Sequence, residues 1–172
     1  MKIKNVEIKA QCHDPQGKRD ILITQGARYI GRDHQIDTYY QTPHGRLKLR
    51  RGNIENALIA YTRENVRNPK LSDVLLYKTY DAASLQEILD RTFDRQIVVD
   101  KTRDIYFIDN IKFHVDDVQG LGTFVEIEAI DEAERFGEDE LRKQVTQYMK
   151  ILGITHEDLL THSYSDMIPE HS

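Results

Sequence analysis

Runs in which charged and apolar residues alternate one by one recur along the chain. Residues 46–50 read Arg-Leu-Lys-Leu-Arg, and residues 124–129 read Phe-Val-Glu-Ile-Glu-Ala. Because successive side chains of a β-strand point to opposite faces, each run predicts a strand with one ionic and one apolar face. The apolar faces must be covered, and the ionic faces must meet water or opposite charge. The chain is therefore limited to a sheet whose two sides differ sharply.

Most of the chain shows a strand pattern. The predicted strands are 2–10, 28–42 (as one strand or two), 46–50, 57–65, 72–80, 96–108, 111–118 and 123–130. Asp109-Asn110 and the segment 120–122, Gly-Leu-Gly, are typical of tight hairpin turns. The strands are therefore expected to pair mainly as antiparallel neighbours.

Three amphipathic helices are predicted between and after these strands. The first begins at Asp14-Pro15 and ends at Gly26, and the second is expected near 84–93, with Ser84 as its cap and Glu87 in a capping box. The third carries apolar residues at helical spacing from Leu141 and stops at Gly153.

The fold class that follows is α+β, with a dominant antiparallel sheet. For any single strand, the simplest interpretation is that the ionic face is exposed to solvent while the apolar face packs on helices. A sheet of about eight strands can also curl into a closed or nearly closed β-barrel, with the helices outside and the ionic faces around a tunnel. Such a tunnel requires opposite charges or a ligand, because unpaired buried charge is costly.

Composition sets the broad class. The 172 residues, 39% of them hydrophobic, suit one domain spanning 1–172. No run of about 18 apolar residues is present, and the charged start is unlike a signal peptide, so we expect a cytoplasmic protein without membrane contact. The net charge of −5 argues against nucleic-acid binding. The single cysteine, Cys12, lacks partners for a disulfide or a zinc site and is expected to be inert.

The ionic faces are sorted by sign. One set of strands supplies Lys48, Arg50, Lys101 and Arg103, and another supplies Glu7, Asp116, Glu126 and Glu128. Lysine and arginine suit phosphate oxygens, and clustered carboxylates suit a hard divalent ion such as Mg²⁺ or Mn²⁺. A linear polyphosphate with a bound metal ion would satisfy both sets.

Several segments resemble one known family, in the family's own order. The segments are NVEIKA, QIDTYY, GRLKLRR, DKTRDIYF, FHVDDVQGLGTFVEIEA and HSYSDMI. Together they cover nearly the whole chain, which is similar to the CYTH superfamily, the triphosphate tunnel metalloenzymes that include class IV adenylyl cyclases and thiamine triphosphatases. The length and the closing segment most resemble the short class IV adenylyl cyclase branch. The resemblance implies a single CYTH domain built as an eight-stranded tunnel.

The resemblance also implies roles for individual residues. The implied metal ligands are Glu7, Asp116, Glu126 and Glu128, for Mg²⁺ or Mn²⁺. The implied triphosphate contacts are Lys9, Lys48, Arg50, Lys101 and Arg103, with Arg63 and Lys78 at looser mid-chain positions. Glu7, Lys9 and Glu126 are the implied catalytic residues. Arg46, Asp117 and His114 fit a solvated or supporting role equally well.

Asn5 departs from the family pattern. It stands where the Glu-x-Glu-x-Lys signature has its first glutamate. An amide oxygen can still coordinate weakly, but it carries no charge and takes no proton. A single metal ion, a different base, or loss of turnover would each follow from this change.

Three functions remain open. In the first, the ribose 3′-hydroxyl of ATP attacks the α-phosphorus and yields cyclic AMP and pyrophosphate. In the second, water attacks an organic triphosphate or inorganic tripolyphosphate, and in the third the protein binds nucleotides or polyphosphate without turnover. No residue identifiable in the sequence reads adenine, and no Gly-x-x-x-x-Gly-Lys phosphate loop is present. A homodimer is compatible with the sequence, although nothing in it specifies one.

Overall fold

A computed structural model describes residues 1–63 and 65–169. Its strands are β1 Lys2–Gln11, β2 Arg28–Tyr40, β3 Arg46–Arg51, β4 Ala57–Arg63, β5 Lys70–Lys78, β6 Arg95–Ile108, β7 Ile111–Val118 and β8 Gly122–Asp131. Its helices are α1 Pro15–Thr24, α2 Ala82–Thr92, α3 Glu138–Ile151 and the one-turn α4 Tyr164–Met167, with a 3₁₀ turn at His156–Asp158. Every predicted strand and helix is present in the described residues. The 28–42 region forms one strand that ends at Tyr40, and residue 64 of the predicted strand 57–65 lies outside the described residues.

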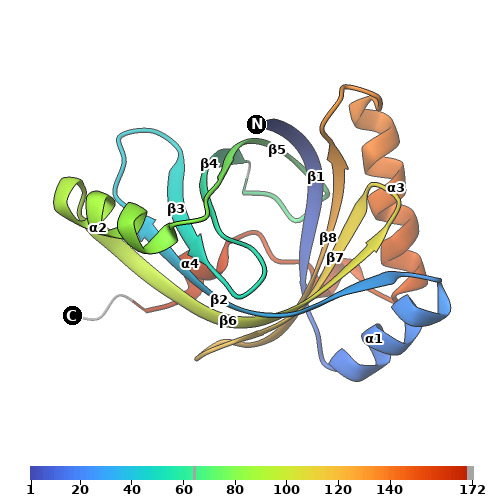
Figure 1. The fold of residues 1–172 in the computed structure, drawn as a ribbon. Helices are drawn as coiled ribbons and strands as arrows, with labels where there is room; N and C mark the ends of the chain where they lie inside the picture. The colour runs from blue at the N-terminus through green and yellow to red at the C-terminus, as the bar shows by residue number, and fades with distance from the viewer. Residues whose placement is uncertain (64, 170–172) are drawn as a thin grey trace.

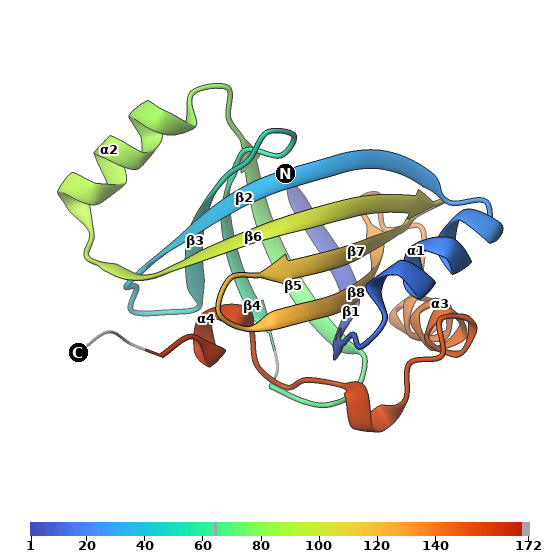
Figure 2. The ribbon, with the colours of Figure 1, turned by 90° about the horizontal axis from the view of Figure 1, so that it is seen from below.

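The eight strands close into an antiparallel barrel in the order β1-β5-β4-β3-β2-β6-β7-β8 (Figure 1). This confirms the predicted α+β barrel. Seen from below, α1 and α3 lie along one side of the barrel, while α2 extends away from it beside β3 (Figure 2). The short α4 lies against the barrel close to β6.

The main hydrophobic core lies outside the barrel. Val6 and Ile8 of β1, with Phe113 of β7, are buried against α3 residues that include Leu141 and Val145. Their sequence neighbours on the strands therefore face the lumen, since side chains alternate with period two. Covering the apolar face outside the barrel is what leaves ionic residues inside it.

The N-terminal cap is predicted correctly for one helix and wrongly for another. Asp14 caps α1 as predicted, its Oδ1 accepting from the Gly17 amide at 3.0 Å. The predicted cap of α2 is wrong, because Asp81, rather than Ser84, caps the helix and accepts from the Ser84 amide at 3.0 Å. A carboxylate at this position also interacts favourably with the helix dipole, so the aspartate takes the role.

None of the helices in the described part of the chain is long and apolar enough to cross a membrane.

Candidate active site in the barrel lumen

A cavity of about 590 Å³ fills the lumen, and all eight strands contribute side chains to its wall. The predicted residues that line it are Glu7, Lys9, Lys48, Arg50, Arg63, Lys78, Lys101, Arg103, Glu126 and Glu128. Asp116, the remaining predicted residue, is buried just behind this wall. The ionic faces therefore turn inward and meet one another. The interpretation that each is merely a solvated face is wrong for these strands.

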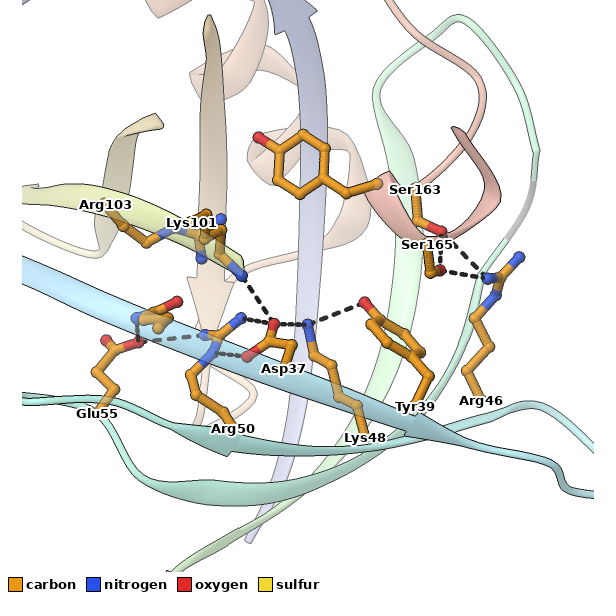
Figure 3. A network of polar contacts seen from close by, with 12 residues as sticks. Asp37, Tyr39, Arg46, Lys48, Arg50, Glu55, Lys101, Arg103, Ser163 and Ser165 are labelled. Carbon is orange, nitrogen blue, oxygen red and sulfur yellow. Dashed lines mark hydrogen bonds and ion pairs between the residues drawn. The ribbon is translucent and has the colours of Figure 1, made fainter. Parts of the chain in front are cut away.

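Asp37 of β2 lies at the centre of the cationic side of the lumen (Figure 3). Arg50 donates to both of its carboxylate oxygens, at 2.9 and 2.8 Å. The ammonium groups of Lys48 and Lys101 lie 3.1 and 2.8 Å from its Oδ2. Burial would raise the pKa of Asp37, but Arg50, Lys101 and Lys48 hold it well below its usual value. The sequence predicts positive and negative side chains on different strands, but this separation is incomplete, because the Asp37 carboxylate lies among three cationic side chains.

Lys101 of β6 is almost completely buried within this cluster. It is 2% exposed, and burial lowers its pKa to about 7, an effect that the nearby Asp37 only partly offsets. Arg50 and Arg103 also disfavour a further positive charge at Lys101. Its side-chain amino group can therefore change protonation state near neutral pH.

A second cluster is organised around Arg103 of β6. Its guanidinium binds Asp116 through two hydrogen bonds of 2.7 and 2.6 Å and also donates to Glu126 at 3.1 Å. The Tyr164 hydroxyl donates to Asp116 at 2.7 Å. Lys9 lies 3.2 Å from Glu126 and 3.6 Å from the centre of the Tyr164 ring. Short α4 thus supplies a residue that supports both Asp116 and Lys9.

A group suited to a metal ion lies next to this cluster. His114, Glu126 and Glu128 each offer one ligand atom, and these atoms lie within 4.8 Å of one another. Burial lowers the pKa of His114 to about 3, so the imidazole is neutral, as a metal ligand must be. Burial raises the pKa of Glu128 to about 7, which indicates that its charge lacks full compensation. The group offers two carboxylates and one imidazole, a set of ligands that fits a divalent cation. The Nε2 atom of His114 is buried without a hydrogen-bond partner among the described residues.

Two predicted metal ligands lie outside this group. The Glu7 carboxylate accepts a hydrogen bond from the Arg63 guanidinium at 2.9 Å. Glu7 is nevertheless close to the group, because it lies opposite Glu128 in the β1–β8 ladder. Asp116 is occupied by Arg103 and Tyr164. Their roles as ligands stay predictions.

The remaining sequence candidates fall at different places. Lys78 is exposed at the mouth of the cavity. Arg46 binds Ser163 and Ser165 at 3.1 Å each and so anchors the α4 segment (Figure 3). Asp117 is exposed, and Asn5 lines the lumen, where its Oδ1 is buried without a partner among the described residues.

Several lumen residues were not singled out from the sequence. They are Asp37, Glu55, Lys112 and Tyr164. Lys112 alternates with His114 and Asp116, so the pattern on β7 could have identified it. Glu55 lies in the loop between β3 and β4, where it accepts from Arg50 at 3.2 Å and contacts Lys112. No periodic signal marks a loop residue of this kind.

Comparisons with known proteins agree with this geometry. The model of the CYTH domain family matches residues 4–164. A Methanocaldococcus jannaschii protein provisionally named an adenylate cyclase is 23% identical, over 94% of this chain and 97% of its own length. A solved Pyrococcus horikoshii structure superposes with a TM-score of 0.79 at 25% identity, covering 96% of this chain and 99% of that one. A Hippeastrum structure, described as an adenylyl cyclase candidate with a dominant triphosphatase activity, has a TM-score of 0.61 at 16% identity and covers 97% of this chain and 93% of its own.

Proposed function

The chain belongs to the CYTH domain family, and we propose that it is a divalent-metal-dependent enzyme that converts ATP to cyclic AMP and pyrophosphate in its lumen. One observation carries the proposal. Lysines and arginines from six strands face a single cavity that also contains the group of His114, Glu126 and Glu128. Such a cavity can hold a highly charged anion together with its cation.

The cations would bind the phosphates. Arg63 has two guanidinium nitrogens, Nε and Nη2, that are buried without partners among the described residues, so they are available to phosphate oxygens. Lys48, Arg50 and Lys101 are held by Asp37 in the free protein and would exchange part of this contact for phosphate. The protein is therefore already charged and ordered where the ligand binds.

His114, Glu126 and Glu128 would hold Mg²⁺ or Mn²⁺. The bound ion would neutralise phosphate oxygens and lower the pKa of the attacking hydroxyl. We assign Glu7, on the strand next to Glu128, to accept the proton that the 3′-hydroxyl loses as its oxygen bonds to the α-phosphorus. Lys9 and Arg103 would stabilise the charge that develops on the departing pyrophosphate.

Hydrolysis of a triphosphate is the second candidate. The same arrangement can position water against a phosphorus atom, because catalysis by positioning and charge does not depend on a particular nucleophile. The description of the Hippeastrum protein, which has the same fold, favours testing this reaction directly.

Product analysis tests the proposal. Purified protein is incubated with Mg²⁺ or Mn²⁺ and either ATP or tripolyphosphate, and the products are separated by chromatography. We expect cyclic AMP and pyrophosphate from ATP, loss of both with excess EDTA, and recovery when the metal is restored. Orthophosphate as the main product would replace the cyclase proposal with hydrolysis. Triphosphate binding without any product would identify a non-catalytic binding protein.

The affinity for triphosphate should fall as the pH rises above about 7. Lys101 has a pKa of about 7 in the free protein because it is buried. A bound polyanion favours its protonated form, so binding above this pH must take up a proton and the Kd rises by up to about tenfold per pH unit. Calorimetric titration with tripolyphosphate between pH 6.5 and 9 measures the slope.

Lys101→Arg is the matched control, because a guanidinium stays charged across this range. Its slope should be smaller than that of the wild type. Identical slopes in the two proteins would show that Lys101 is not the group that titrates.

A further inference from the structure

Glu55 is a negative charge at the lumen wall that the proposed reaction does not use. It lies in the loop between β3 and β4, residues 52–56, and lines the same cavity as the strands. Arg50 donates to its carboxylate at 3.2 Å (Figure 3) and Gln35 at 3.3 Å. The ammonium group of Lys112 forms an ion pair with the other carboxylate oxygen. Three donors from three strands therefore hold this one carboxylate.

The loop that carries Glu55 is fixed by polar contacts of its own. The fully buried carboxylate of Asp33 accepts the amides of Ile54 and Glu55 at 2.8 and 2.9 Å. The Asn56 side chain closes the loop on the Gly52 backbone through hydrogen bonds of 3.1 and 2.9 Å. A Cβ atom at Gly52 would lie 2.7 Å from both carboxylate oxygens of Asp33, so glycine permits this close approach. The loop therefore holds Glu55 in a defined position.

Lys112 has a second carboxylate within reach. It lies directly opposite Glu128 in the β7–β8 ladder, and both residues line the cavity. Opposite charges at directly paired positions, with Cβ atoms about 4.5–5.5 Å apart, ordinarily attract each other. Among the described residues, however, the one ion pair of Lys112 is with Glu55. The closest charged or titratable partner of the Glu128 carboxylate within that part of the chain is the His114 ring, at 3.8 Å.

The position of the Lys112 ammonium decides whether Glu128 can bind a cation. An ammonium group on Glu128 would neutralise this carboxylate and occupy an oxygen that a divalent ion needs as a ligand. In the structure Lys112 contacts Glu55 instead, and Glu128 keeps its place beside His114 and Glu126, with the three ligand atoms within 4.8 Å of one another.

We propose that Glu55 is a positioning residue that holds Lys112 away from Glu128 and so keeps the group of His114, Glu126 and Glu128 open to a divalent cation. This inference rests on the metal dependence in the proposed function and adds a residue that controls metal affinity without being a ligand. Glu55 acts through Lys112, so its effect should vanish when residue 112 carries no charge.

Binding of Mn²⁺ to the metal-free protein, without nucleotide, tests this role. Wild type, Glu55→Gln, Lys112→Met and the double variant are titrated with Mn²⁺, and the free ion is followed by electron paramagnetic resonance. We expect Glu55→Gln to raise the Kd of Mn²⁺ about tenfold, because the released ammonium group turns to Glu128. In the Lys112→Met background, the same substitution should change the Kd by no more than about twofold. Glu128→Gln should raise the Kd at least as much as Glu55→Gln, which places the bound ion at this group.

The two backgrounds separate this inference from the proposed function. Equal weakening in both would mean that Glu55 acts through its charge alone, and no weakening in either would mean that Lys112 does not compete. Both results overturn the inference and leave the metal site standing, whereas wild-type protein that binds no Mn²⁺ would overturn the metal dependence as well. Thermal melts establish that each variant is folded. If Glu55→Gln does not fold, Glu55→Asp keeps the charge on a shorter side chain, and its smaller increase in Kd should again disappear with Lys112→Met.

Discussion

Glu126→Gln should lower kcat by at least about 100-fold. The carboxylate of Glu126 lies 3.2 Å from Lys9, 3.1 Å from Arg103 and 3.4 Å from the His114 ring, and it belongs to the candidate metal group. Glutamine keeps the shape but removes the charge and turns one acceptor into a donor. Residues that merely support a metal ligand are worth about 10–100-fold, so loss of a ligand that also orients Lys9 should exceed that range.

The measurement is kcat at saturating ATP, with Mg²⁺ and Mn²⁺ titrated separately. Asp117→Asn is the matched control, since Asp117 is a nearby acidic residue on β7 that is exposed to solvent. Thermal melts establish that both variants are folded. If folded Glu126→Gln retains activity within a few-fold of the wild type, the active site lies elsewhere.

The barrel was predictable because most strands place one face in an apolar core. On β1 the alternation of Asn5, Glu7 and Lys9 with Val6 and Ile8 separates lumen from core without ambiguity. Charged and apolar residues alternate because the outer face of the barrel packs on helices while the inner face lines the lumen. The alternation is therefore visible in the sequence of each strand whose outer face is covered by a helix. The charged wall of the lumen was predictable for the same reason.

Asp37 shows where this reasoning fails. On β2 the outward residues His34, Ile36 and Thr38 border a second, more polar cleft, so both faces of the strand carry polar side chains and no alternation marks the lumen. The partners of Asp37 depend on the closure of the barrel, because Lys48 and Lys101 contact it from two different strands, β3 and β6. Such convergence depends on strand order and register, which period-two patterns do not specify.

The loop residue Glu55 and the α4 residue Tyr164 were missed for related reasons. Glu55 is placed by buried Asp33, whose carboxylate accepts the amides of Ile54 and Glu55 at 2.8 and 2.9 Å. Tyr164 lies in a helix of four residues, which is too short to show helical periodicity. Both positions depend on contacts between distant parts of the chain.

Asp37→Asn should weaken the fold and at the same time strengthen the binding of triphosphate. The carboxylate is buried amid Lys48, Arg50 and Lys101, so its removal leaves three cations without their common partner. Breaking a buried ion pair costs about 3–5 kcal/mol. The loss should be smaller above about pH 7, because Lys101, whose pKa burial has already lowered to about 7, can then release its proton.

A bound polyphosphate would supply the missing negative charge. In the wild type it must compete with Asp37 for the same three cations, and in Asp37→Asn it does not. We expect the Kd of tripolyphosphate to fall about tenfold at pH 6.5, in line with one charge-assisted hydrogen bond of about 1.5–3 kcal/mol. The increase in Tm on adding tripolyphosphate should accordingly be larger for Asp37→Asn than for the wild type.

The control is Asp73→Asn, which removes an exposed carboxylate from the outer face of β5 and the same amount of formal charge. If the two variants gained equal affinity, the effect would be one of net charge alone. If Asp37→Asn lost affinity, Asp37 would be needed to hold the cations in their binding positions and would not act as their competitor. Only a gain confined to Asp37→Asn means that this carboxylate occupies, in the free protein, the place that phosphate oxygens take in the complex.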